Sequence, residues 1–223
     1  MDLPALLLSL KLGAATVAVL LPLAVLAGRH LATRRYRGKA AVEALLALPL
    51  LLPPTVIGYY LLVAFGRATP LGQAFEVLFG QPLTFSFAGL LVASVIVNIP
   101  FAVQPIQRGF EAIAPELREA AACSGMSPWI AFLRVELPLA WPAIVSAIAL
   151  VFAHTLGEFG VVLMVGGSIP GETRTASIAI YDSVQAFDDR AAGLMAATLL
   201  AISVLALAIV HALARRGGRR RHG

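Results

Sequence analysis

The chain alternates between long apolar runs and short polar stretches. Each run holds about 20 or more residues with few charges, the length that an α-helix needs to cross a bilayer. The runs are apolar at consecutive positions rather than at every second position, which does not fit the strands of a membrane β-barrel. The pattern predicts an all-α polytopic membrane protein with about five transmembrane helices, at residues 5–28, 40–65, 84–106, 141–164 and 191–214.

The composition indicates that most side chains are surrounded by lipid and not by water. Of 223 residues, 59% are hydrophobic and 13% are charged, whereas soluble domains carry about a quarter charged residues. This excludes a soluble globule and a disordered chain. The stretches between the runs are too short for a soluble catalytic domain, so residues 1–223 are interpreted as one transmembrane domain. The lone Cys123 excludes an intrachain disulfide and a Cys-rich metal site.

The net charge of +5 is concentrated in clusters between the apolar runs. Such clusters fix the orientation of a membrane protein and do not indicate nucleic-acid binding. Alternate loops hold thirteen Lys and Arg residues on one side and three on the other, which predicts an outside N-terminus and a cytoplasmic C-terminus. The thirteen are Arg29, Arg34, Arg35, Arg37, Lys39, Arg108, Arg118, Arg134, Arg215, Arg216, Arg219, Arg220 and Arg221.

Two further stretches need an interpretation. A sixth span within 165–190 is rejected, because Glu172, Arg174 and three aspartates lie there; we expect an external loop with a short helix around 174–186. The basic tail Arg215–His222 is interpreted as a stop-transfer anchor. A lipid-binding basic patch is the alternative.

The longest cytoplasmic stretch, about 108–138, has strong local helix signals. Pro115 suits a first helical position, where a missing N–H costs nothing, and Gly125 suits the left-handed position after a helix end. Ser127 and Pro128 then suit the start of a second helix. We expect this helix to run to Leu137 and to be interrupted by Pro138.

The first of these two helices carries a small-residue face. Ala120, Ala121 and Ser124 would permit the close approach of another backbone. An amphipathic hairpin lying on the membrane fits this face, and so does a short helix docked in a groove of a cytoplasmic partner. The residues alone leave both interpretations open.

The same segment resembles a known family. Glu119-Ala120-Ala121, three residues, Gly125, nine residues and then Val135-Glu136-Leu137-Pro138 is similar to the EAA signature of ABC importer permeases, with Val135 in place of the usual Ile. The resemblance implies that this element is a coupling helix, which sits in a cleft of a separate ATP-hydrolysing subunit. The residues that it assigns to coupling are Glu119, Ala120, Ala121, Gly125, Leu137 and Pro138.

Other segments narrow the resemblance. LPLLLPPTVIGYY at 48–60, LGEFG at 156–160 and GGSIPGETRT at 166–175 are similar to the molybdate and sulfate branch of these permeases, and the compact length is most similar to molybdate permeases. The resemblance covers about 5–214. No residue discriminates molybdate from sulfate, thiosulfate or tungstate by its own chemistry.

An importer needs an energy source and a complete pore. The only Gly-Lys pair, Gly38-Lys39, lacks the rest of a phosphate-binding loop, so we expect no cofactor in this chain and ATP bound by a partner ATPase. Five spans make half a pore, so a second permease copy is expected. The resemblance implies a homodimer in the inner (plasma) membrane, two ATPase copies and an external oxyanion-binding protein. The residues themselves leave a homodimer and a heterodimer equally open.

Within the spans, a tetrahedral dianion would need hydrogen-bond donors. Cations are scarce there, and Lys11 is expected to snorkel outward. The expected donors are hydroxyls, amides and backbone N–H groups at broken helices. Expected breaks lie at Pro49, Pro53-Pro54-Thr55, Asn98-Ile99-Pro100 and Gly157–Gly160, which makes Thr55, Pro100, Gly157 and Gly160 candidate path residues.

His154 and Glu158 are four residues apart in the fourth span, and intramembrane ionisable residues are functional candidates. The preferred hypothesis is a polar clamp that shapes the gate. A hydrogen-bonded packing pair is the alternative, and a metal pair lacks an evident third ligand. Asn98 either hydrogen-bonds between helices or lines the pore. Glu43 is expected to contact Lys39 one turn away.

Two other functional classes have weaker support in the sequence. An intramembrane protease or phosphatase would need a nucleophile–base pair or a metal triad, and apart from His154 the spans contain no such set. An ion-coupled secondary transporter would need buried carboxylates, for which Glu158 alone is thin support.

Overall fold

The structure, a computed structural model, describes residues 1–219. Helices follow one another without any strand in this range, which confirms the all-α prediction. The helices are α1 Leu3–Thr33, α2 Lys39–Leu51, α3 Pro54–Phe65, α4 Pro70–Phe79, α5 Phe87–Glu111, α6 Pro115–Cys123, α7 Pro128–Ala131, the π-helix η1 Phe132–Glu136, α8 Leu137–Gly157, α9 Gly160–Gly166, α10 Ala176–Gln185 and α11 Asp189–Arg219.

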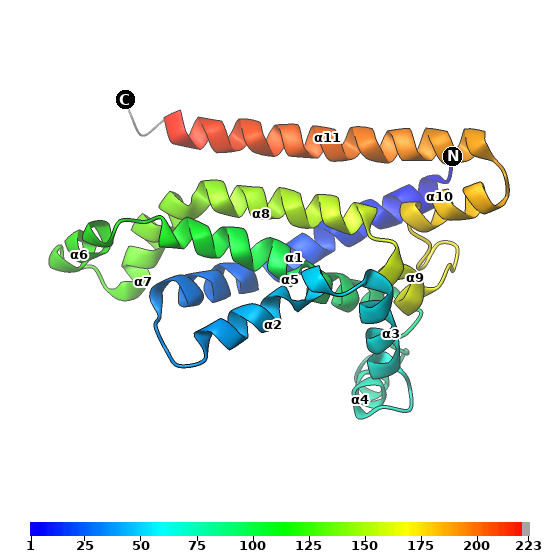
Figure 1. Ribbon diagram of the computed structural model, residues 1–223, viewed down its shortest axis with the longest axis horizontal. Coiled ribbons are helices and arrows are strands. Elements are labelled where there is room, and N and C mark those ends of the chain that lie inside the picture. The colour runs from blue at the N-terminus through cyan, green and yellow to red at the C-terminus, as the bar shows by residue number, and fades with distance from the viewer. Residues whose placement is uncertain (220–223) are drawn as a thin grey trace.

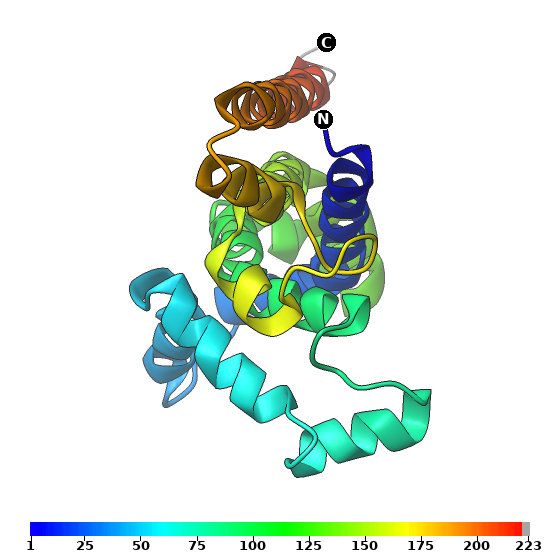
Figure 2. The same ribbon diagram turned by 90° about the vertical axis from the view of Figure 1, so that its right-hand side faces the viewer.

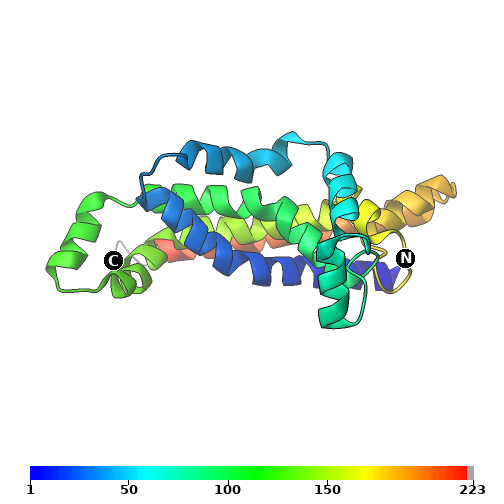
Figure 3. The same ribbon diagram turned by 90° about the horizontal axis from the view of Figure 1, so that it is seen from below.

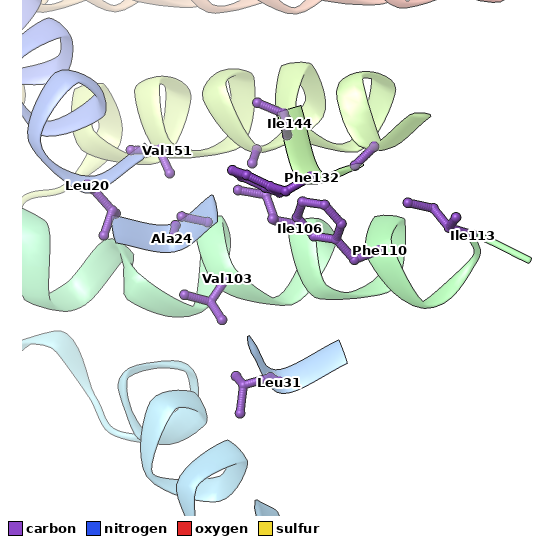
Figure 4. Packing of buried hydrophobic residues seen from close by; sticks show 13 residues of the cluster. Leu20, Ala24, Leu31, Val103, Ile106, Phe110, Ile113, Phe132, Ile144 and Val151 are labelled. Carbon is purple, nitrogen blue, oxygen red and sulfur yellow. The ribbon is translucent and has the colours of Figure 1, made fainter. Parts of the chain in front are cut away.

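Three long helices, α1, α5 and α8, form the core of the molecule and run side by side (Figure 1). Leu20, Ile106, Phe110, Phe132 and Ile144 belong to the cluster of buried side chains between them (Figure 4). Helix α11 lies along α8, whereas α2 lies on α5 and α3 lies on α9. Seen end-on, α3 and α4 reach away from the three-helix core (Figure 2).

Small residues let the core helices approach closely. A Cβ atom added at Gly28 of α1 would lie 2.8 Å from Cγ2 of Ile106 on α5, and one added at Gly109 of α5 would lie 2.4 Å from Cβ of Ala143 on α8. Lipid tails are as apolar as the core side chains, so helix association in a membrane depends on close packing. These two glycines therefore hold α5 against both of its neighbours.

Among the described residues, four helices are long and apolar enough to cross a membrane: α1, α5, the continuous helix Pro128–Gly157 and the Asp189–Ile209 part of α11. They correspond to four of the five expected spans. The fifth, expected over 40–65 with a break at Pro53-Pro54-Thr55, consists of α2 and α3. These two helices are bent by 108°, so they form a broken span or a re-entrant loop.

The bend has a local cause. Pro53 and Pro54 remove two consecutive backbone donors, and a residue that precedes a proline is pushed out of the helical region. Leu52 and Pro53 accordingly have extended ψ angles of 142° and 136°. The break that the sequence predicts at Pro53-Pro54-Thr55 is confirmed, whereas Pro49 lies inside α2 without ending it.

Two other expectations about prolines are wrong. Pro100, where a break is expected, lies inside the continuous helix α5, because neighbouring helices hold a transmembrane helix together through a proline. Pro138 does not interrupt the helix that starts at Pro128. The π-helix η1 directly precedes it, with Leu137 N–H bonded to the Phe132 carbonyl, and this wider turn makes room where an α-turn would clash with the proline ring.

The span expected at 141–164 is therefore displaced. It begins at Pro128 and ends at Gly157, because Glu158 is extended, with ψ 126°. The separate helix α9 follows, so the predicted break at Gly157–Gly160 is confirmed. The short helix predicted around 174–186 is also confirmed, as α10.

The predicted cytoplasmic segments share one end of the molecule. The end of α1, α6 and the end of α11 gather at the left of Figure 1, and the N-terminus and α10 lie at the right. This agrees with the segregation of the basic clusters, while the orientation in the membrane stays a prediction. Residues 220–223 lie outside the described part, so the expectation for Arg215–His222 falls partly outside it.

Candidate functional site

Helix α6 forms a projection at the basic end of the molecule (Figure 3). Its local signals are confirmed: Pro115 starts the helix, and Gly125 has a φ of +75°, the left-handed conformation that glycine adopts without strain. Ser127 Oγ accepts a hydrogen bond from Ile130 N–H at 3.4 Å at the start of α7. The result is a short helix, a tight turn and a second helix in a fixed arrangement.

The candidate coupling residues differ in exposure. Glu119, Ala120 and Gly125 are exposed, and so is Ser124. Ala121 is 5% exposed, so it packs against the protein's own chain and does not belong to the outer face of α6. Leu137 and Pro138 lie at the start of α8, away from α6, where they follow the π-helix.

A buried carboxylate that sequence reasoning missed lies beside this element. Glu136, 4% exposed, accepts hydrogen bonds from Arg29 Nε at 2.6 Å and Arg29 Nη2 at 3.2 Å. Arg118 Nε of α6 lies 3.5 Å from its Oε1. The available signal was a carboxylate between apolar residues, which must find a cation. The identity of that cation was hidden, since Arg29 lies 107 positions away.

The middle of the bundle contains a neutral network. Asn98 of α5, fully buried, donates from Nδ2 to the Ser94 carbonyl at 2.8 Å and to Thr155 Oγ1 of α8 at 3.1 Å. Its Oδ1 lies 3.2 Å from Nδ1 of His154, whose ring stacks on Phe101 at 4.1 Å between centroids. The interpretation of Asn98 as an interhelical hydrogen-bonding residue is confirmed.

Glu158 connects this network to the break before α9. Its Oε1 accepts a hydrogen bond from Val161 N–H at 2.9 Å, and Oε2 lies 3.8 Å from His154 Nε2. Ser177 Oγ donates to the Glu158 carbonyl at 2.8 Å. A carboxylate at a helix N-terminus satisfies free N–H groups and interacts favourably with the helix dipole. Glu158 therefore contacts His154, as the spacing predicts, and also caps α9.

Several of the predicted path residues line two adjoining cavities, which share Leu50 and Phe101. His154 and Glu158 line a cavity of about 190 Å³ together with Pro54 and Phe101. Pro100 lines a different cavity, of about 650 Å³, between α5 and α8. Thr55 and Gly157 are exposed. In the described residues, no group of three His, Cys, Asp or Glu side chains lies together to hold a metal ion.

Gly160 has a packing role. A Cβ atom there would lie 2.9 Å from Cβ of Pro54 and 3.3 Å from Thr55 N. The absence of a side chain thus lets α9 approach the Pro-Pro bend, which closes one wall of the 190 Å³ cavity.

Lys39 makes the expected contact with Glu43, and Lys11 lies beside an aromatic ring. Lys11 is exposed and its Nζ lies 4.4 Å from the centre of the Phe87 ring. Lys39 Nζ lies 3.6 Å from Glu43 Oε1, which also accepts a hydrogen bond from Gln107 at 2.7 Å.

This architecture has known relatives. Residues 21–219 match the family described as binding-protein-dependent transport system inner membrane component. The chain belongs to this family. The permease is 46% identical to the molybdenum transport system permease protein ModB of Azotobacter vinelandii over 206 residues, which cover 92% of this chain and 91% of that one. It is 36% identical to ModB of Escherichia coli, with 96% of each chain covered.

Two other comparisons are more distant. The sulfate transport system permease protein CysT of Escherichia coli is 37% identical over 83% of the permease and 67% of its own length. The crystal structure of a bacterial alginate ABC transporter, in complex with a periplasmic protein that holds an alginate pentasaccharide, contains a chain that superposes with a TM-score of 0.76. That chain is 17% identical and the match covers 96% of the permease and 78% of the other chain, which shows the shared fold.

Family membership decides between the classes considered from the sequence. The permease is a multi-pass membrane subunit of a transport system and not itself an enzyme. The intramembrane enzyme and the ion-coupled secondary transporter are both set aside, since neither is a binding-protein-dependent system.

Proposed function

We propose that the permease is the membrane-spanning subunit of an ATP-driven molybdate importer in the inner membrane. The observation that carries this proposal is the 46% identity to a molybdenum permease over nearly the full length of both chains. The sulfate permease CysT is matched over only 67% of its length, as expected of a longer chain. Sulfate, with thiosulfate and tungstate, is the second candidate, because CysT is still 37% identical.

Helix α6 is the proposed contact with the ATPase. Its Glu119, Ala120 and Gly125 are exposed and project from the end where the basic clusters gather (Figure 3). A short exposed helix of this kind can lie in a groove of a partner. ATP is bound and hydrolysed by that partner, with two ATPase copies per complex and no cofactor in the permease.

A second copy of the permease would complete the pore as a homodimer. Support comes from α2, which is mostly apolar but has no buried residue in the single chain. The bent α2–α3 pair also lies on the outside of the core, where a second copy can reach it (Figure 2). The external oxyanion-binding protein would dock at the opposite end, where α10 lies.

The anion path is proposed to use neutral donors near the 190 Å³ cavity. The Glu158 carboxylate already accepts a hydrogen bond from the Val161 N–H of α9 and lies beside the His154 ring. Its charge therefore repels a passing dianion less than the charge of a free carboxylate would. Opening at the Pro-Pro bend would expose the Thr55 N–H at the start of α3, because the Val56, Ile57 and Val161 N–H groups are already hydrogen-bonded. An N–H group at a helix N-terminus is the kind of group that binds oxyanions. His154 and Glu158 would then act as a clamp that sets the width of the gate.

Recovery of the partner tests the coupling assignment. The tagged permease is purified from native membranes in mild detergent, and its partners are identified by mass spectrometry. We expect an ATPase subunit with the native chain and its loss with Glu119→Arg. Glu111→Arg is the control, because it makes the same charge change at an exposed residue near the basic end that belongs to α5 and not to α6. An ATPase retained by Glu119→Arg would move the contact away from α6.

Substrate identity needs a second experiment. The purified complex is placed in liposomes with binding protein that is loaded with molybdate or with sulfate, and ATP hydrolysis and anion uptake are measured. We expect molybdate-loaded protein to stimulate both. Stimulation by sulfate-loaded protein alone would replace molybdate by the second candidate, and no ATP-dependent uptake of either anion would overturn the importer assignment.

A further inference from the structure

The basic end of the permease contains a carboxylate with two arginines from different helices. Glu136 lies at the end of η1, directly before α8, and is 4% exposed. An ion this buried persists only where cations and hydrogen bonds compensate for lost hydration. Arg29 supplies that from α1 and Arg118 from α6. The carboxylate therefore joins the coupling helix to two transmembrane helices.

The two arginine contacts differ. Arg29 binds both carboxylate oxygens, at 2.6 and 3.2 Å, and its guanidinium lies 4.8 Å from the centre of the Phe132 ring. Arg118 Nε lies 3.5 Å from Glu136 Oε1 and has no hydrogen-bond partner within residues 1–219. The contact to α1 is thus closely fixed, while the contact to α6 has room to shorten or lengthen.

Arg118 also reaches α5. Its Nη2 donates to the Phe110 carbonyl at 2.7 Å and its Nη1 to the Ile113 carbonyl at 3.4 Å. The guanidinium is therefore placed between the end of α5 and the start of α8. A cation there also interacts favourably with the negative end of the α5 dipole.

Helix α6 needs such a connection. It has nine residues, of which only Ala121 is buried, and isolated helices of this length are marginal in water. It packs on α7 and η1 and projects beyond the core (Figure 1). A force applied to its outer face would be absorbed by local bending unless a stiff contact passed it to the core helices.

We propose that Glu136 and Arg118 are positioning residues that transmit displacement of α6 to α1 and α8, with the Arg118–Glu136 contact as the adjustable joint and the Arg29–Glu136 pair as the fixed one. This inference rests on the proposed function, in which α6 contacts the ATPase. It adds two residues outside the EAA positions, Arg118 and Arg29, and gives a role to Glu136 at the variable position of the signature.

The test measures how much ATP is hydrolysed for each anion imported. The native complex and variants are placed in liposomes with ATPase subunit and molybdate-loaded binding protein. Glu136→Gln keeps the volume and a hydrogen-bond acceptor but removes the charge. We expect the ratio of ATP hydrolysed to molybdate imported to rise roughly threefold or more, because Arg118 loses its ionic attraction to η1 and α6 is held less firmly to α8.

Matched variants give this result its meaning. Glu43→Gln removes the charge of another carboxylate near the basic end, the partner of Lys39, and should keep the native ratio. Arg118→Gln should raise the ratio as Glu136→Gln does. The double variant should raise it no further than Glu136→Gln alone, since both changes break the same Arg118–Glu136 contact. If Glu136→Gln does not yield a folded complex, Arg118→Gln decides alone, because Arg118 is 28% exposed and tolerates change.

The opposite outcome is equally clear. An unchanged ratio in both single variants, even with lower uptake, would reduce the contact to a structural one and overturn the inference while the importer assignment stands. If the native complex binds no ATPase or imports nothing with ATP, the proposed function fails, and this inference fails with it.

Discussion

The basic end and the middle of the bundle solve the same problem with different chemistry. Both bury polar side chains that connect helices. At the basic end the groups are ions, Arg29, Glu136 and Arg118. In the middle they are mostly neutral, with Asn98 bonded to Thr155 and in contact with His154.

The difference follows from depth. Near the helix ends, long arginine side chains reach water and headgroups, so a charge costs less than at the bilayer centre. In the middle, amides and hydroxyls are cheaper to bury and gain modest interhelical hydrogen bonds. The basic end therefore has strong, fixed contacts suited to carrying force, and the middle has weaker contacts that can rearrange.

The largest expected effect tests the strength of the basic end. Arg29→Ala leaves the Glu136 carboxylate without its two close hydrogen bonds, and breaking a buried pair from one side costs about 3–5 kcal/mol. The free energy of unfolding is measured for the purified permease in mixed micelles. Lys39→Ala is the control, since an i, i+4 pair at the surface is worth about 0.3–0.5 kcal/mol. A loss below about 1 kcal/mol for Arg29→Ala would remove the contrast between the two regions.

The next effect concerns the break beside the cavity. Gly160→Ala places a Cβ atom 2.9 Å from Pro54 Cβ, and overpacking of this kind costs about 1–3 kcal/mol. The same unfolding measurement applies. Gly157→Ala is the control, because no atom lies within 4 Å of a Cβ at that position. Equal stabilities of the two variants would show that α9 does not pack on the bend as closely as described.

The neutral network should give a smaller energy. A double-mutant cycle with Asn98→Ala and Thr155→Val isolates the 3.1 Å hydrogen bond between α5 and α8. We expect a coupling of about 1 kcal/mol, within the range measured for interhelical hydrogen bonds in membranes. Asn98→Ala combined with Thr198→Val should be additive, because Thr198 bonds within α11. A coupling as large as the Arg29 effect would contradict the weak-network interpretation.

The smallest change in stability is expected for Glu158→Gln. The amide oxygen still accepts the Val161 N–H, so only the charge–dipole term of about 0.3–1 kcal/mol is lost. Uptake should nevertheless fall if the carboxylate belongs to the gate. Glu76→Gln, at the surface pair with Arg67, is the control. Unchanged uptake by Glu158→Gln would exclude a gating role for its charge.

Features set by near neighbours in the chain were predictable from the sequence. The ends of α6 follow from Pro115 and Gly125, and the start of α7 follows from Ser127, because caps are contacts over three or four residues. The His154–Glu158 contact follows from the helical spacing for the same reason. The apolar runs likewise predict four of the spans.

Features set by packing were not predictable. The sequence predicts a helix break at Pro100, at Pro138 and at the Pro53-Pro54 pair alike, but only the pair ends a helix. The outcome depends on whether neighbours support the helix through the missing hydrogen bond. The partner of Glu136 was hidden for a related reason, because the packing of α1 on α8 brings Arg29 to it across 107 positions.

The π-helix η1 also keeps one helix continuous. It closes its turn over five residues where an α-helix uses four, between the segment that carries α6 and the core helix α8. The extra residue widens this turn, and Pro128–Gly157 runs through it as one helix. Deleting one residue from Phe132–Glu136 would restore an α-turn, and the Pro138 ring would then clash with the carbonyl group four residues earlier. The length of this single turn therefore decides whether the segment that carries α6 and α7 remains a straight extension of α8.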